Sequence, residues 1–432
     1  MSNENTNPWT PEDEGDHYPV MKEWWTIETL FKTLEDNKKW NFKVIIPYKM
    51  EDSSCFFQYA LFDITNKRCL LRRDIDDDIK KLSHEKNKLD LKYGKCTVAG
   101  LYPYYNIHIE DEEQGFNIDM KYEANSFPHW IAHNITNGKV PFGWNFYKYG
   151  YIPNCALSGT IKIKDESYTI KGKGYLEHIW GNWSYQNPFR KLSSIGDTIS
   201  TYLKLGKWWL AQHKQRIPHS IEFTTENNIF GYDWVWGVFD NNWSLFYGNV
   251  LFWLSRGPAF GVLSLTPDGK KYWDFCNITF RYNKSIYVKK YDIYFPSELE
   301  LTGVLEDKKI HLRFWLTTES YEYIDEFKNK GFYKAFVLSE MPGEMEGLYI
   351  DKERTVKLKG DCKMMPLRQP SSLGHNSLKI DFLMPPRGIG IDIDFNSHYL
   401  KRSIRNKIQL APVPKFDLKI KKLKKEDFFG NG

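Results

Sequence analysis

Gly174-Tyr-Leu-Glu-His-Ile-Trp-Gly-Asn-Trp183 is the most informative stretch of this chain. Two runs before it, residues 159–164 and 167–174, are rich in β-branched and aromatic residues and predict two strands joined by a turn. The stretch then continues the second strand of a β-hairpin. Because successive side chains of a strand face opposite ways, we expect Glu177 to share a face with Ile179, and His178 with Trp180.

This alternation has two interpretations. If either face lines a cavity, a carboxyl or an imidazole lies beside flat apolar walls, which suits acid–base chemistry on an apolar substrate. The alternative is structural: a buried Glu177–His178 pair that joins two strands.

Composition predicts a large protein rich in aromatic side chains. The 432 residues exceed the usual size of one domain, so we expect two. Aromatic residues make up 16% of the chain, which favours strands and apolar pockets. The net charge of +5 is small and no nucleic-acid motif is present, so no nucleic-acid partner is predicted.

The cysteines and the N-terminus indicate a cytoplasmic protein. The six cysteines are isolated in the sequence, without a CxxC pair, as expected for free thiols in a reducing compartment. The first residues are polar and lack the apolar segment of a secretory signal. No apolar run approaches the ~20 residues of a membrane helix.

Short aromatic or β-branched runs alternate with turns from Glu23 onward, which predicts an all-β sandwich or barrel. We expect helix only at residues 74–92, a charged segment that is otherwise a solvated loop, and at 197–216. The second segment has an apolar stripe at helical spacing. It either packs over a barrel mouth or touches lipid through Leu205, Trp208, Trp209 and its lysines.

The C-terminal residues 401–425 carry ten Lys or Arg against a single acid, Asp417. An edge strand with an exposed lysine face explains this charge, because lysines protect a sheet edge from aggregation. Peripheral contact with an anionic membrane is the alternative.

Several short motifs, taken in order, resemble the carotenoid 1,2-hydratase/AttH-like family, also called hydroxyneurosporene synthase-like. They are Glu23-Trp24-Trp25, the Gly174–Gly181 segment, Tyr232-Asp-Trp-Val-Trp-Gly-Val-Phe and Asn242-Trp-Ser-Leu. The segment Asp13–His17 resembles the D-x-G-x-H that precedes E-W-W in that family. The family has Asp at its central acid, where this chain has Glu177.

The resemblance implies two consecutive lipocalin-like (calycin-type) β-barrels with a helical insertion, and a ligand pocket in or between them. We expect a flexible arm at 1–19, a first barrel at 20–245 with the insertion at about 187–220, and a second barrel with a basic tail at 246–432. Relatives hydrate isoprenoid or prenyl double bonds or fold polyenes. The resemblance therefore implies a hydratase or an isomerase/cyclase acting on a hydrophobic isoprenoid-like molecule, without a cofactor.

Such chemistry needs a carboxylic acid that protonates a double bond and aromatic rings that stabilise the cation. Glu177 or Asp233 is the predicted donor, and His178 holds the carboxyl or orients water. We expect Glu177 near Trp180 or Trp236 beside an apolar cavity, without an arginine partner. The predicted substrate-binding residues are Trp25, Trp180, Trp183, Tyr232, Trp234 and Trp236.

Two further alternatives concern metal and catalysis. His129 and His133 have a spacing that could bind metal on a helix, but Pro128 and the flanking strands argue against a helix, so we predict no metal site. A non-catalytic lipocalin-like carrier of a lipid or pigment would share the same fold and pocket. A protonated carboxyl in the pocket favours the enzyme, and a wholly apolar pocket favours the carrier.

Overall fold

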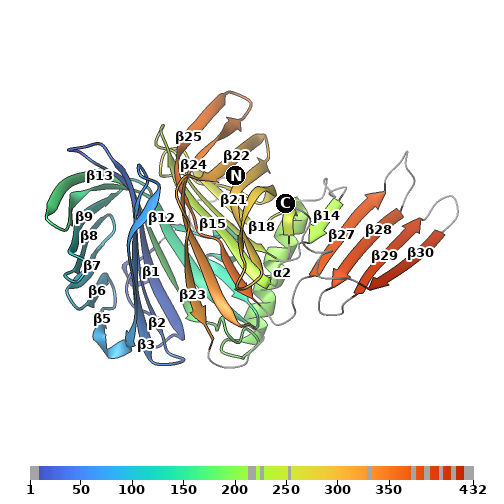
Figure 1. The fold of residues 1–432 in the computed structure, drawn as a ribbon, viewed down its shortest axis with the longest axis horizontal. Coiled ribbons are helices and arrows are strands. Elements are labelled where there is room, and N and C mark those ends of the chain that lie inside the picture. Colours follow the sequence, from blue (N-terminus) through green and yellow to red (C-terminus); the bar gives the residue numbers. More distant parts are fainter. Residues whose placement is uncertain are drawn as a thin grey trace.

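The computed structural model describes residues 9–212, 220–223, 228–251, 254–327, 333–370, 376–383, 390–397, 402–409 and 415–422. Most of these residues belong to two antiparallel sheets, each of which curls into a barrel (Figure 1). The two barrels lie side by side and helix α2 (Ile195–Gln212) packs at one end of them. The prediction of an all-β chain of two lipocalin-like barrels with a helical insertion is confirmed.

The first sheet follows the order β4-β3-β2-β1-β13-β12-β9-β8-β7-β6-β5, with β10 and β11 paired to β12. The long β12–β13 hairpin is at its centre, and β1 pairs with β13 so that Thr26 lies opposite Glu177. Its strands are β1 (Lys22–Thr33), β2 (Lys39–Lys49), β3 (Ser54–Asp63), β4 (Arg68–Asp78), β5 (Leu82–His84), β6 (Leu89–Tyr93), β7 (Cys96–Leu101), β8 (Tyr104–Asp111), β9 (Phe116–Ala124), β10 (His129–Trp130), β11 (Lys139–Phe142), β12 (Asn145–Ile163) and β13 (Glu166–Asn182).

The second sheet runs from β14 to β30 in chain order, with extra pairings such as β15–β25 and β24–β26. Strands β27 to β30 extend away from the barrels (Figure 1). Its strands are β14 (Ser220–Phe223), β15 (Asn228–Phe239), β16 (Ser244–Leu251), β17 (Leu254–Pro258), β18 (Phe260–Thr266), β19 (Trp273–Phe275), β20 (Asn277–Val288), β21 (Ile293–Leu305), β22 (Lys308–Leu316), β23 (Tyr321–Glu326), β24 (Ala335–Ile350), β25 (Thr355–Met364), β26 (Leu367–Pro370), β27 (Asn376–Leu383), β28 (Gly390–Ser397), β29 (Arg402–Gln409) and β30 (Lys415–Lys422).

Helix is scarce in the described residues. The expected helix at 197–216 is present as α2 up to Gln212, and residues 213–216 lie outside the described residues. The helix expected at 74–92 is wrong. That segment ends β4, forms the short 3-10 helix η2 (Ile79–Lys81) and continues as β5 and β6. Exposure alternates along β4, which is the strand period, and β3 supplies its hydrogen-bonding partner. The other short helices are η1 (Pro11–Asp13) and α1 (His133–Thr136).

The change of sheet falls between Asn182 and Ser220 rather than at the expected boundary of residue 245. Residue 245 lies inside β16, and both β15 and β16 hydrogen-bond within the second sheet. The hairpin that contains Trp234 and Trp236 therefore belongs to the second barrel. Sequence spacing alone did not reveal this, because β15 takes its other partners, β25 and β26, from more than a hundred residues away.

The two barrels have separate cores, and a third apolar cluster lies where they meet. Strands β1 to β13 bury one core and strands of the second sheet bury another. The third cluster combines side chains of both barrels, among them Tyr149, Tyr175, Trp234 and Phe246. The six cysteines are free thiols. Among the described helices, none is both long and apolar enough to cross a membrane.

Residues 9–19, expected to be part of a loose arm, pack against the first barrel. Trp9 stacks on Trp130 with ring centroids 5.0 Å apart, and Glu14 and Asp16 are buried. The Glu14 carboxylate accepts hydrogen bonds from the Tyr102 backbone N–H at 3.1 Å and the Tyr105 hydroxyl at 2.9 Å. A polar arm can therefore be ordered when the barrel supplies donors for its carboxylates.

The arm makes stability depend on pH. Burial raises the pKa of Glu14 from 4.5 to about 7, so between these values the folded chain holds a proton that the unfolded chain has lost. Glu14 therefore costs stability progressively as the pH rises through that window, by as much as ~3 kcal/mol. Urea unfolding at several pH values checks this: the wild type should lose stability relative to Glu14→Gln between about pH 4.5 and 7. Parallel curves for the two proteins would contradict it.

Candidate functional site

A cavity of about 590 Å³ lies between the two barrels. Strands β1, β2 and β13 of the first barrel line one side, strands β15, β16 and β24 of the second line the other, and α2 borders it. Its volume is in the range of small-molecule pockets, and most of its walls are aromatic or aliphatic. Among the described residues, buried side chains pack the core of each barrel, whereas the interface leaves room for a ligand.

Glu177 reaches this cavity from the middle of β13 and is only 3% exposed. Its Oε1 atom accepts hydrogen bonds from Trp24 Nε1 and Thr26 Oγ1, both at 3.3 Å. Its Oε2 atom accepts from the Tyr149 hydroxyl, from the Tyr175 hydroxyl at 2.7 Å and from Trp234 Nε1 at 3.2 Å. All five donors are neutral groups.

The two tyrosines next to Glu177 keep their protons. Burial raises the pKa of Tyr149 and Tyr175 well above the ordinary value of 10, and their hydrogen bonds to Glu177 raise it further. Tyr149 also accepts a hydrogen bond from Trp234 Nε1 at 2.8 Å. A carboxyl in contact with two hydroxyls that stay protonated is a unit through which a proton can move to or from a bound molecule.

Aromatic rings surround this unit on the cavity side. Tyr175 and Trp234 meet edge to face at 5.3 Å, and Trp24 lies parallel to Tyr185 at 6.2 Å. Helix α2 contributes Trp208 and Trp209, and the Trp209 indole stacks on Phe260 at 4.7 Å. These rings present apolar and π-rich walls to whatever the cavity holds.

The strand alternation expected from the sequence is present, and it separates two of the predicted catalytic residues. Glu177 and Ile179 line the cavity, whereas His178 and Trp180 lie on the opposite face of β13. The His178 ring is fully buried there, 2.7 Å from Glu23 Oε1, and stacks on Trp25 at 4.6 Å. The structure therefore places His178, Trp25 and Trp180 away from Glu177 and the cavity.

Trp183 and Trp236 are buried close to the cavity without lining it. Trp236 donates from Nε1 to the Pro153 carbonyl at 2.8 Å, which ties the second barrel to β12. Trp183 packs against Trp24 at 5.2 Å and Tyr147 at 5.0 Å. Their position supports the walls. The indoles next to Glu177 are those of Trp24 and Trp234, rather than the expected Trp180 or Trp236.

Asp233 borders the cavity, but its carboxylate binds Arg368 Nη1 at 3.1 Å and the Tyr282 hydroxyl. Burial raises its pKa, while the Arg368 charge opposes the rise. We expected a proton donor without an arginine partner. Asp233 has such a partner, whereas Glu177 has no arginine among its hydrogen-bond partners in the described chain. Of the remaining predicted residues, Tyr232 and Trp234 line the cavity.

Three hydrogen-bond partners of Glu177 escaped the sequence analysis: Trp24, Tyr149 and Tyr175. Strand period could have identified Tyr175, because it lies two residues before Glu177 on the same face. Trp24 belongs to the Glu-Trp-Trp motif, in which the neighbouring Trp25 was chosen. No local signal marks Tyr149, which lies on β12 opposite Ile179 and reaches Glu177 only through the β12–β13 pairing. Outside the cavity, His129 pairs with Asp274 at 3.1 Å.

The fold and this cavity define a class: two lipocalin-like barrels with an aromatic-lined cavity at their interface. The chain is similar in structure to an AttH-like protein of Nitrosomonas europaea, with a TM-score of 0.57 at 14% identity, over 83% of this chain and 95% of that one. It is also similar to kievitone hydratase of Nectria haematococca, with a TM-score of 0.52 at 11% identity, over 84% and 98%. At these identities the likeness concerns the fold. No protein-family model and no curated protein sequence matches the chain.

Proposed function

We propose that this protein is a hydratase or an isomerase/cyclase that protonates a double bond of a hydrophobic, isoprenoid-like molecule. The observation that carries the proposal is Glu177 in contact with two protonated tyrosines at the wall of an aromatic cavity of about 590 Å³. The similarity in fold to kievitone hydratase supports it.

The proton balance of a hydration runs through Glu177. A proton carried by the Glu177 carboxyl passes to one alkene carbon, and the other carbon becomes a tertiary cation near the indoles of Trp24 and Trp234, which line the cavity. Water adds to the cation, and the proton it releases returns to the Glu177 carboxylate. In an isomerase or cyclase the cation instead loses a proton elsewhere or is trapped by a second double bond of the same molecule.

A non-catalytic carrier remains the second candidate, and one observation favours it. Both Glu177 oxygens already accept hydrogen bonds from protein donors, so the carboxyl needs no ligand to fill its hydrogen-bonding capacity. In a carrier this cluster would only hold the walls of the cavity together.

Mass spectrometry of a solvent extract of the purified protein, followed by incubation of the identified ligand in D₂O, tests the proposal. An enzyme incorporates deuterium at the protonated carbon, and a hydratase also adds the mass of one water. A ligand that is bound and recovered unchanged, without deuterium, would contradict the enzymatic proposal and establish the carrier.

We also propose that α2 brings the cavity to an anionic lipid surface. Leu205, Trp208 and Trp209, the residues expected to touch lipid, border the cavity instead. Away from the cavity, α2 exposes Ile195, Ile199 and Leu203, and the last two are 44% and 68% exposed. Lys204 and Lys207 are exposed on the same helix and would meet the negative headgroups.

Replacing Ile199 and Leu203 together by Ser should remove most co-sedimentation with anionic liposomes at low salt, because apolar insertion is lost. High salt should weaken the wild type as well, since each lysine contributes about 1 kcal/mol that salt screens. Leu34→Ser, at a turn of the first barrel and 59% exposed, is the matched control and should bind like the wild type. A wild type that never sediments on anionic vesicles would eliminate the lipid contact.

A further inference from the structure

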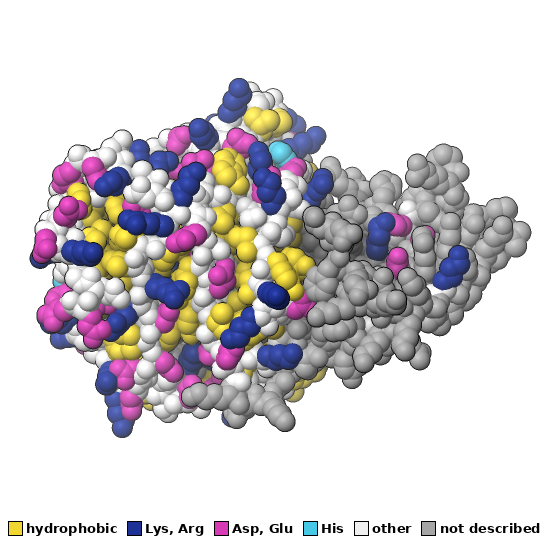
Figure 2. Space-filling view, in the orientation of Figure 1, with side chains coloured by type: hydrophobic (Ala, Val, Ile, Leu, Met, Phe, Trp, Pro, Cys, Tyr) yellow, Lys and Arg dark blue, Asp and Glu magenta, His cyan; other side chains and the backbone are white. Residues whose placement is uncertain are grey.

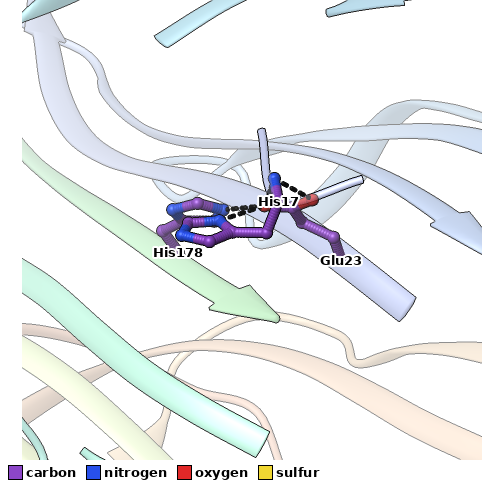
Figure 3. A group of neighbouring side chains, drawn as sticks. All are labelled: His17, Glu23 and His178. Atoms are coloured by element: carbon purple, nitrogen blue, oxygen red, sulfur yellow. Dashed lines mark hydrogen bonds and ion pairs between the residues drawn. The ribbon is translucent and has the colours of Figure 1, made fainter. Parts of the chain in front are cut away.

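A second polar cluster lies on the face of β13 that points away from the cavity. Figure 3 shows its three side chains, His17 from the N-terminal arm, Glu23 from β1 and His178 from β13. His17 Nδ1 lies 2.9 Å from Glu23 Oε1, and His178 Nε2 lies 2.7 Å from the same oxygen. The ligand atoms of all three lie within 4.8 Å of one another. The proposed reaction at Glu177 uses none of them.

Neighbouring protein groups hold the three side chains in place through hydrogen bonds and ring stacking. His178 Nδ1 lies 2.7 Å from the Asp13 carbonyl, and Glu23 Oε2 accepts a hydrogen bond from the Tyr48 hydroxyl at 2.6 Å. Trp25 stacks on the His178 ring, and Trp180 stacks on the His17 ring at 3.9 Å. Metal-binding histidines usually donate their second ring nitrogen to a carbonyl or carboxylate in this way, which fixes the tautomer and the ring orientation.

The hydrogen-bond partners of His178 leave one contact unexplained. Both ring nitrogens face oxygen acceptors, the Asp13 carbonyl and the Glu23 carboxylate. A neutral imidazole has a single N–H, so when Nδ1 donates to the carbonyl, the Nε2 lone pair faces a carboxylate oxygen. Either a second proton on the His178 ring, or a cation bound by both Nε2 and the Glu23 oxygen, must therefore lie between these two atoms.

We propose that His17, Glu23 and His178 bind one divalent transition-metal ion, with Zn²⁺ as the preferred occupant. Two imidazole nitrogens and one carboxylate oxygen form a common three-ligand zinc set, which leaves a fourth position for water. The His17 side chain is 23% exposed, whereas those of Glu23 and His178 are fully buried, so the ion would enter from the arm side. The sequence analysis expected no metal. It could not predict this site, because the three ligands are separated by up to 161 residues.

The site would fasten the N-terminal arm to two strands of the first barrel. His17 is the single ligand that the arm supplies, while Glu23 and His178 lie on the neighbouring strands β1 and β13, two positions apart in their register. Metal binding would then lower the mobility of the arm and raise the stability of the whole first barrel, because the ion binds the folded chain only. The chemistry at the cavity is independent of it.

Tag-free, full-length protein dialysed against EDTA and then against micromolar ZnCl₂ tests the proposal. Elemental analysis should find about one zinc per chain in the wild type, and zinc should raise the melting temperature by several degrees. His17→Ala should lose both effects while remaining folded, since His17 is partly exposed. His84→Ala is the matched control: His84 is similarly exposed and also pairs with a carboxylate, Asp16, at 2.9 Å, and its loss should leave the zinc content unchanged.

Two results would overturn the proposal. In the first, the wild-type protein takes up no zinc and melts at the same temperature with and without it. His178 would then carry a second proton and form an ion pair with Glu23 in place of a metal site. Equal zinc content in wild type and His17→Ala would place the metal elsewhere. Neither result depends on an assay of the proposed reaction, so a failure of the metal proposal can be told apart from a failure of the proposed function.

Discussion

Glu177→Gln lowers turnover of the identified substrate by at least ~100-fold while the chain stays folded. Glutamine keeps the shape of the side chain and an oxygen that Tyr149 and Tyr175 can bind, but it carries no transferable proton. The loss should appear in kcat rather than in the affinity for the ligand, because the aromatic walls are unchanged. Rapid-mixing kinetics and equilibrium binding of the same ligand separate these two quantities.

Asp233→Asn is the comparison that gives this result meaning. Asp233 also borders the cavity, but its carboxylate is bound to Arg368, so the change should reduce stability and affect kcat far less than Glu177→Gln. Circular dichroism and a thermal melt confirm that both variants are folded. Turnover that survives Glu177→Gln unaltered would exclude Glu177 as the proton donor.

Glu340→Gln destabilises the folded chain by about 3–5 kcal/mol, the cost of leaving buried charges unpaired. Glu340 on β24 of the second barrel binds Lys43 on β2 of the first, and it binds Lys363 on β25 at 2.9 Å. The side chains of all three are at most 1% exposed. Burial would raise the pKa of Glu340, but the two lysine charges outweigh it and hold that pKa below its ordinary value. The carboxylate is therefore ionised and joins the two barrels.

Urea-induced unfolding, followed by tryptophan fluorescence, measures the loss. Glu346→Gln is the matched control on the same strand, where a half-exposed carboxylate lies 3.4 Å from Arg313, and it should change stability by less than ~1 kcal/mol. Equal stabilities for the two variants would mean that the buried charges do not hold the barrels together. Because Lys43 also lines the cavity, Glu340→Gln should weaken ligand binding in parallel.

Local pattern determined much of this protein in advance. The density of short aromatic strands predicted an all-β chain, and the period of two placed Glu177 and Ile179 opposite His178 and Trp180. The lysine-rich segment near the C-terminus forms β30, the last strand of its sheet, as an edge strand would. Each of these inferences depends on residues adjacent in sequence, whose geometry the backbone itself dictates.

Tertiary structure decided which of the two faces of β13 is the candidate site. Packing of the second barrel put Trp234 and Phe246 against the Glu177 face, while the N-terminal arm covered the His178 face and produced the cluster with His17 and Glu23. The same packing turned Trp208 and Trp209 of α2 toward the cavity and left Leu203 exposed. A strand pattern tells which side chains share a face, but what covers that face depends on contacts between residues far apart in the chain, and those form only when the barrels meet.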